Sequence, residues 1–352
     1  MADYDHMPSA DLPYVMFMQA PNYATPSVNT DSFGLRYSTG PDGQQFGLKD
    51  LENRSVNLFV GGSTAFGVGA SHDSHSISSR LSGVTGEYWL NIAGRAFSGK
   101  QELILFQSLL SHLGDIKKIV LFSGINDLTL HYLTPDVPKP YGGFFHWTTF
   151  RRAMALAGLT KNRRRLATVL HPLTGDQVDF SRISAHQIPG AVFKSLFSAN
   201  NESVVSWKEQ AERQTQRKDD LLPLVRNNLR TWKLLADGLG VELYFVLQPI
   251  YNWIDKPQCN EETKLFAELD GYIHNQYKVL KEVLNRDMHD WYARNLEAIC
   301  IDLKIDYSDM SMMMSGRYGE KDWIFVDRAH FTDAGYGIVA EKILEIVSSR
   351  TG

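Results

Sequence analysis

The segment VGGSTAFGVGA runs from Val60 to Ala70 and joins a short apolar run to a series of small residues around one serine. Residues 56–60 have the length and apolar character of a buried strand, and the Gly-Gly pair that follows is typical of a strand end. Ser63 is therefore either a nucleophile held on a turn or an ordinary loop hydroxyl. A nucleophilic serine needs a base and a third group that orients the base. Whether the rest of the chain contains these two groups therefore distinguishes the two interpretations of Ser63.

Several other apolar runs have the length of strands and end in turn or loop residues. We expect strands at 56–60, 119–122 and 241–247, with weaker candidates at 87–92 and 298–305. The spacing of apolar residues between these runs predicts helices at 101–113 and at 219–239, the second stopping at Gly238. A mixed helical segment at 263–295 should break near Gly271. A last helix should run from an N-cap at Thr332 to about Ser348.

Alternating strands and helices predict βαβ units and hence a mostly parallel sheet with helices on both faces. The expected fold class is therefore α/β. In such sheets reactive groups collect in the loops at the carboxyl ends of the strands. Ser63 lies at one such end, and the segment Ser123-Gly124-Ile125-Asn126 lies at another.

Two regions do not follow the alternation. Residues 29–46 are rich in turn formers with short extended pieces, which indicates a β-ribbon on the edge of the sheet within an N-terminal extension, 1–54. The main domain, 55–352, is expected to carry an insertion at about 131–217. Because this insertion follows a strand-end loop, we expect it to form a lid over the site. It holds aromatic and basic side chains that are candidates for binding substrate: Phe144, Trp147, Arg163, Arg164 and Arg165.

Composition excludes several function classes. The 352 residues are 43% hydrophobic and 22% charged, which is ordinary for a globular protein, and the net charge of -4 argues against bulk nucleic-acid binding. Cys259 and Cys300 give no disulfide framework and no metal-ligand spacing, so both are expected as reduced thiols. No signal-like N-terminus and no run long enough to span a membrane is present. A soluble, cytoplasmic protein is the expectation.

Partners for the serine occur near the C-terminus, in DWIFVDRAHFTDAGY. Asp327 and His330 are three residues apart, so their side chains can meet, with the carboxylate holding the imidazole while its other nitrogen faces Ser63. Acyl transfer also needs donors for a developing oxyanion. Asn126 offers its side-chain amide, Ser63 its backbone N–H, and the loop in NIAGRAFSGKQEL a third donor.

These blocks resemble the SGNH (GDSL-like) hydrolase superfamily over roughly residues 55–347. Gly-x-Asn-Asp is present at 124–127, and Asp-x-x-His at 327–330 is followed by Phe-Thr-Asp-Ala-Gly. The resemblance implies a flavodoxin-like three-layer α/β/α sandwich, with Ser63, His330 and Asp327 as a catalytic triad. There are two departures. Gly62 stands where the family usually has an acid, and the second oxyanion N–H falls on either Gly94 or Ala96, depending on the register.

Other functional interpretations of these and neighbouring motifs have less support in the sequence. The glycine-rich segment could bind phosphate, but it lacks the Lys-Ser/Thr of a P-loop and the dinucleotide spacing. His72 and His75 have loose metal spacing, for which a solvated loop is the simpler interpretation. Methionines at 310 and 312–314 could line an acyl pocket or only pack in the core. The basic run at 151–165 is either a solvated helix face or a contact for an anionic surface, carrier or substrate.

The resulting hypothesis is a serine esterase that cleaves an acyl ester, such as an acylated carbohydrate or small metabolite, through an acyl-enzyme. It needs no metal and no organic cofactor. An O-acyltransferase with the same residues is the nearest alternative, because only the acceptor admitted to the site differs. A non-catalytic binding protein on the same fold is the third. The acyl group, the alcohol and the oligomeric state are not determined by these residues.

Overall fold

The computed structural model describes residues 1–51, 54–134, 137, 141–147, 149–151, 154, 209, 212–213, 215, 217–271 and 278–349. The chain divides into two compact units. The larger contains Met1–Phe145 and Arg217–Gly352, and the smaller contains His146–Gln216. The expected lid at 131–217 falls mainly on residues outside the described part. Its first residues belong to the end of helix α5 (Ile125–Leu133).

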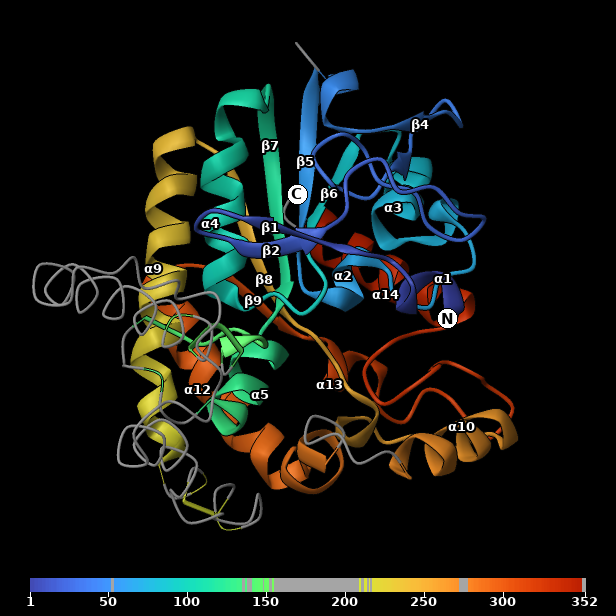
Figure 1. Ribbon diagram of the computed structural model, residues 1–352, viewed down its shortest axis with the longest axis vertical. Helices are drawn as coiled ribbons and strands as arrows, with labels where there is room; N and C mark the ends of the chain where they lie inside the picture. The colour runs from blue at the N-terminus through green and yellow to red at the C-terminus, as the bar shows by residue number, and fades with distance from the viewer. Residues whose placement is uncertain are drawn as a thin grey trace, which may run out of the picture. The chain divides into compact units, whose positions relative to one another are not determined.

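The larger unit is built on a five-stranded parallel sheet with the order β6-β5-β7-β8-β9 (Figure 1). Its strands are β5 (Ser55–Gly61), β6 (Trp89–Ala93), β7 (Asp115–Ser123), β8 (Glu242–Leu247) and β9 (Asp306–Asp309). Counted along the chain from β5, this order is 2-1-3-4-5, which is the flavodoxin-like arrangement. The predicted parallel α/β sheet is confirmed. The chain places β6 on one side of β5 and then returns to place β7 on the other side, so β5 and β7 flank the topological switch point.

Helices cover both faces of this sheet, as Figure 1 shows. On one side α3 (Ile77–Thr85) packs against β6 and α14 (Asp333–Ser348), and α13 (Met310–Met314) contacts β8. On the other side α4 (Gly99–Leu109) packs against α9 (Leu222–Leu239), which also contacts α12 (Arg286–Leu303). Since both faces are covered, β6 is buried along its whole length and β5 at all but its first residue. This accounts for the near-continuous apolar runs in the sequence.

The predicted helices are largely present. Residues 101–113 fall in α4 and the short 3₁₀ turn Leu110–His112, and the helix begins with a capping box between Ser98 and Gln101. The mixed segment breaks at Gly271, which ends α10 (Asn260–Asp270). Thr332 is the N-cap of α14, where its side chain accepts a hydrogen bond from the Gly335 N–H.

Two expectations from the sequence are wrong. Residues 298–305 are not a strand, because most of them lie in α12, where Leu296, Ile299 and Cys300 are buried at helical spacing. The strand is the polar segment β9, which lies at the edge of the sheet and is only partly buried. Gly238 does not stop α9. The helix continues to Leu239 and ends at Gly240, which has the left-handed φ of +69°.

The N-terminal region contains more β-structure than the sequence indicates. The expected ribbon at 29–46 contains β3 (Ser38–Thr39) and β4 (Gln45–Phe46), an antiparallel pair. β3 also contacts β6, the edge strand of the sheet. Before the ribbon, α1 (Ala2–Asp5) is followed by an antiparallel hairpin of β1 (Ser9–Leu12) and β2 (Met16–Gln19). The hairpin was not expected, because its strands are short and their turn contains no glycine.

No helix in the described part of the chain is both long enough and apolar enough to cross a membrane. Cys259 and Cys300 are both free and buried. Burial raises the pKa of the Cys300 thiol to about 12.

Candidate active site

The candidate site lies at the carboxyl ends of β5 and β7, next to the switch point. Gly61, the last residue of β5, pairs with Ala93 of β6 and with Phe122 of β7. The three loops that follow these strands therefore begin side by side at one edge of the sheet. In open α/β sheets this is where ligands bind.

Ser63 is the first residue of α2 (Ser63–Phe66), a four-residue helix that begins directly after β5 with Gly62 as N-cap. The first N–H groups of a helix have no partner within it, so the Ser63 N–H is available to a ligand. The side chain of Ser63 is half-buried, and its Oγ lies 2.7 Å from His330 Nε2.

His330 is oriented by Asp327. The distance from His330 Nδ1 to Asp327 Oδ2 is 2.6 Å, and Asp327 Oδ1 accepts hydrogen bonds from the N–H groups of Ala329 and His330, at 2.7 and 2.8 Å. Burial by itself would raise the pKa of Asp327. The imidazole of His330 and the hydrogen bonds outweigh this effect and hold the pKa below its usual value. The carboxylate is thus kept ionised, as a residue that stabilises an imidazolium must be.

Asn126 lies in the first turn of α5, and its Nδ2 donates to the Phe97 carbonyl at 2.7 Å. An amide nitrogen carries two hydrogens, so one remains for a ligand. Gly62 packs against this amide, because a Cβ at position 62 would lie only 2.6 Å from Asn126 Nδ2. The absence of a side chain at Gly62 therefore lets Asn126 approach the turn that carries Ser63.

The structure distinguishes the two candidates for the second oxyanion donor. The Gly94 N–H already donates to the Gly61 carbonyl at 3.2 Å, so it is not available. Ala96 has the left-handed φ of +60°, which glycine adopts more readily. No hydrogen bond of its N–H is present within the described residues. Of the two, Ala96 is the one that can donate to a ligand.

A pocket of about 50 Å³ opens beside Ser63, Asn126, Asp327 and His330. Its other lining residues are Ile125, Thr129, Gln248, Leu280 and Ala329. Thr129 is buried, and its hydroxyl has no hydrogen-bond partner in the described part of the chain. The pocket thus has apolar walls at Ile125 and Leu280 among mostly polar lining residues, and within the described residues the Thr129 hydroxyl is unpaired.

The segment that leads to Asp327 is held by a buried glutamate that sequence reasoning missed. Glu262 Oε1 accepts from the N–H groups of Ile324 and Phe325, each at 3.1 Å, and Oε2 forms an ion pair with Lys256 at 2.6 Å. Both charged side chains are fully buried. Glu262 is also the third residue of a capping box, but its N-cap is Cys259. An unusual N-cap hides this signal, since Ser and Thr mark such boxes.

None of the described residues that line the pocket beside Ser63 is a substrate-binding candidate from the sequence. Arg163, Arg164 and Arg165 lie outside the described residues. Phe144 is half-buried and does not line the Ser63 pocket, and Trp147 stacks on Phe150 in the smaller unit.

The histidines and methionines singled out in the sequence do not line the pocket either. His75 pairs with Asp333, and the described residues contain no cluster of three or more metal-ligating side chains. Met310 and Met314 are buried in the core, whereas Met312 is exposed.

No protein-family model and no curated protein matches this chain. Several solved structures are similar to it at low identity, including the following three. The acetyl xylan esterase AlAXEase is 11% identical, with a TM-score of 0.38 over 83% of this chain and 99% of its own. The lipase/acylhydrolase from Enterococcus faecalis is 11% identical, with a TM-score of 0.39 over 84% and 96%. The extracellular lipase from Streptomyces rimosus is 9% identical, with a TM-score of 0.42 over 84% and 99%. Similarities of this size assign no activity, so the fold rests on strand order and the site on the contacts above.

Proposed function

We propose that this chain is an SGNH-type serine esterase in which Ser63, His330 and Asp327 form the catalytic triad. The observation that carries the proposal is the continuous hydrogen-bonded chain from Ser63 Oγ to His330 Nε2, at 2.7 Å, and from His330 Nδ1 to Asp327 Oδ2, at 2.6 Å. These distances are within the reach that a nucleophile and its base require. The sequence motifs and the position at the switch point support the same assignment.

The proposed reaction proceeds through an acyl-enzyme. Ser63 Oγ attacks the ester carbonyl carbon while its proton passes to His330 Nε2, and the intermediate collapses as the alcohol leaves with that proton. Water then attacks the acyl group and gives a proton to His330. Collapse of the second intermediate releases the carboxylic acid and returns the proton to Ser63. Asp327 stays ionised and stabilises the imidazolium in both halves.

Three donors are proposed for the oxyanion: the Ser63 N–H, the Ala96 N–H and the second hydrogen of Asn126 Nδ2. Their support is that each is unpaired among the described residues and that each lies in a segment that follows a strand at the same sheet edge. Donors fixed before the substrate arrives stabilise the developing charge without reorganising.

The pocket beside Ser63 favours a short acyl group. Its volume of about 50 Å³ is a few times the roughly 10–15 Å³ that a cavity needs to hold one water molecule, which suits a small group such as acetyl. Ile125 and Leu280 supply apolar walls for such a group.

The test is labelling with a serine-directed phosphonate together with a panel of p-nitrophenyl esters of rising chain length. We expect one adduct, on the peptide that contains Ser63, and the highest kcat/KM for the shortest esters. Sugar alcohols added to the assay separate hydrolysis from acyl transfer through the yield of acylated sugar. An adduct that persists in Ser63→Ala would overturn the assignment of the nucleophile.

A further inference from the structure

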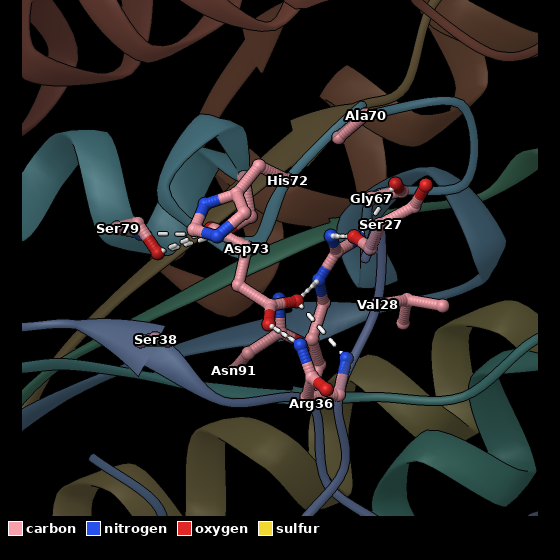
Figure 2. Close-up of polar contacts among 12 residues, drawn as sticks. Ser27, Val28, Arg36, Ser38, Gly67, Ala70, His72, Asp73, Ser79 and Asn91 are labelled. Carbon is pink, nitrogen blue, oxygen red and sulfur yellow. Dashed lines mark hydrogen bonds and ion pairs between the residues drawn. The ribbon is translucent and has the colours of Figure 1, made fainter. Parts of the chain in front are cut away.

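Arg36, from the N-terminal extension, is fully buried. Figure 2 shows its side chain among polar contacts with Asp73 and with Gly67, the residue that follows α2. Arg36 Nε donates to Asp73 Oδ1 at 2.8 Å, and one terminal nitrogen donates to the Ser27 carbonyl at 2.8 Å. The other terminal nitrogen donates to the carbonyls of Phe66 and Gly67, at 3.1 and 2.7 Å. The guanidinium therefore joins the extension to the C-terminal end of α2.

Two of the carbonyls that Arg36 binds, those of Phe66 and Gly67, belong to the turn that begins with Ser63. The last carbonyls of a helix have no partner within it, and a four-residue helix has little stability of its own. In the same turn, the N–H groups of Gly67 and Val68 both donate to the Ser63 carbonyl at 3.0 Å. The guanidinium is thus two hydrogen-bonded steps from the backbone of Ser63.

The extension also contacts this turn through Tyr4. The Tyr4 hydroxyl lies 3.0 Å from the Gly67 carbonyl and 2.6 Å from the Ala70 carbonyl, and it accepts from Arg36 at 3.0 Å. Gly67 has a φ of +94°, and a Cβ there would lie 2.6 Å from the guanidinium. The glycine after α2 is therefore required by the close approach of Arg36 as well as by its own backbone conformation.

The carboxylate that pairs with Arg36 is also fully bonded. Asp73 Oδ2 accepts from Asn29 Nδ2 at 2.6 Å and from Gln45 Nε2 at 3.1 Å. The partners of the Asp73 carboxylate among the described residues, Asn29, Arg36 and Gln45, all come from the ribbon region. A buried ion pair contributes little net stability compared with apolar residues, but it fixes geometry when every hydrogen bond is made.

We propose that Arg36 is a positioning residue that holds the α2 turn so that Ser63 Oγ meets His330. The inference rests on the proposed function. It assigns to the N-terminal extension a part in the reaction, through one buried side chain and the carbonyls of Phe66 and Gly67. Misplacing a reacting atom by about 1 Å can cost on the order of 100-fold in rate, so the geometry of this turn matters even though Arg36 touches no substrate.

The test compares Arg36→Lys and Tyr4→Phe with a control of similar stability loss. Ile116→Ala serves as the control, because Ile116 is buried near the start of β7, at the opposite end of the sheet from the site. For each purified variant the unfolding midpoint, kcat and KM for p-nitrophenyl acetate, and the rate of phosphonate labelling are measured. We expect Arg36→Lys to lower kcat and the labelling rate by about 10- to 100-fold with KM changed by less than about twofold. Tyr4→Phe should lower both by about two- to fivefold, since the guanidinium remains.

The outcomes separate the two proposals. If Ile116→Ala keeps its kcat while Arg36→Lys loses it at a similar unfolding midpoint, positioning is supported. If both lose kcat equally, or Arg36→Lys keeps it, the positioning proposal is overturned. Should Arg36→Lys not fold, Tyr4→Phe decides, and an unchanged labelling rate overturns the proposal. Ser63→Ala is included in the panel, because undiminished activity there removes the proposed function and this inference with it.

Discussion

Near Ser63 a buried carboxylate is paired with a buried guanidinium. Near Asn126 two buried carboxyl groups lie close to each other, and neither is paired with a cation in the described part of the chain. Asp73 and Arg36 form the first cluster, with both side chains fully buried. Glu102, on α4, and Asp127, beside Asn126, form the second. In the part of the chain that the structure describes, neither of these two acids takes part in an ion pair.

The second cluster is stabilised by protonation and hydrogen bonds. Burial, and then the nearby Asp127, raise the pKa of Glu102 to about 8, against the effect of a hydrogen bond from Ser123 Oγ at 2.7 Å. Burial raises the pKa of Asp127 to about 6, against the Gly99 N–H and Lys100. The comparison shows two ways to bury acids beside a site: one supplies a fixed counter-charge, and the other leaves the acids sensitive to pH.

The largest expected effect is on the nucleophile. Ser63→Ala should lower kcat for a short p-nitrophenyl ester by about 10⁶-fold, because the covalent route is lost. The measurement is steady-state kinetics with enzyme purified free of host esterases. A loss below about tenfold would mean that the turn after β5 does not carry the nucleophile.

Breaking the buried ion pair of Arg36 and Asp73 should lower the stability of the fold. Arg36→Met should lower the free energy of unfolding by about 3–5 kcal/mol, because Asp73 stays buried without its counter-charge. Urea unfolding measures this. Lys233→Met breaks the exposed pair of Lys233 and Asp237 on α9 and is the matched control, with an expected cost below about 1 kcal/mol. Equal costs for the two variants would contradict the role given to burial.

In the region of Glu102 and Asp127, the substitution Asn126→Ala should lower kcat by about 100- to 1000-fold with little change in KM. This is the usual cost of removing one oxyanion donor. Kinetics with the same ester measure this. Asn227→Ala, an exposed change on α9, is the control and should leave kcat unchanged. If only KM rises in Asn126→Ala, the amide binds the substrate and does not stabilise the transition state.

The buried carboxyl groups of Glu102 and Asp127 should make the stability of the fold depend on pH. A carboxyl whose pKa is raised in the folded state contributes stability at low pH, and this contribution is lost as the pH rises toward the folded pKa. Between its ordinary pKa of 4.5 and about 8, Glu102 should therefore lower the unfolding midpoint as pH increases. Glu102→Gln keeps an oxygen that can accept from Ser123 but does not titrate, so it should flatten this slope.

The pH dependence is measured by thermal unfolding from pH 5 to pH 9, with Glu345→Gln on the exposed side of α14 as control. The control should follow the wild type. A slope that survives in Glu102→Gln would assign the pH dependence to other groups.

Much of this architecture could be predicted from local sequence patterns. Apolar runs identified β5, β7 and β8 because strands covered on both faces need apolar residues at almost every position. Thr332 and Gly271 were recognised because caps and breaks act within one helical turn. The edge strand β9 was missed since it is polar, and α12 was mistaken there for a strand because short apolar runs suit either structure.

In the candidate site, too, local motifs could be recognised from the sequence and long-range contacts could not. Its residues Ser63, Asn126, Asp327 and His330 were all found from short motifs, and the structure brings their side chains together. Arg36, Glu102 and Glu262 could not be found, because a charged residue in a sequence is normally on the surface and nothing local shows that its partners are buried with it. Arg36 and Asp73 are 37 residues apart and meet only in the folded chain.

The sequence by itself determined the central strands and the helices around them, the strand ends that carry the motif residues, and the local Asp327–His330 pair, because each depends on spacing within a few residues. The tertiary structure decided what depends on contacts between distant segments. It paired the Gly94 N–H with the Gly61 carbonyl and left the Ala96 N–H without a partner among the described residues. It also placed a guanidinium from the N-terminal extension against the turn that begins with Ser63. Hydrogen bonds between separate loops arise only when the sheet has brought those loops to one edge.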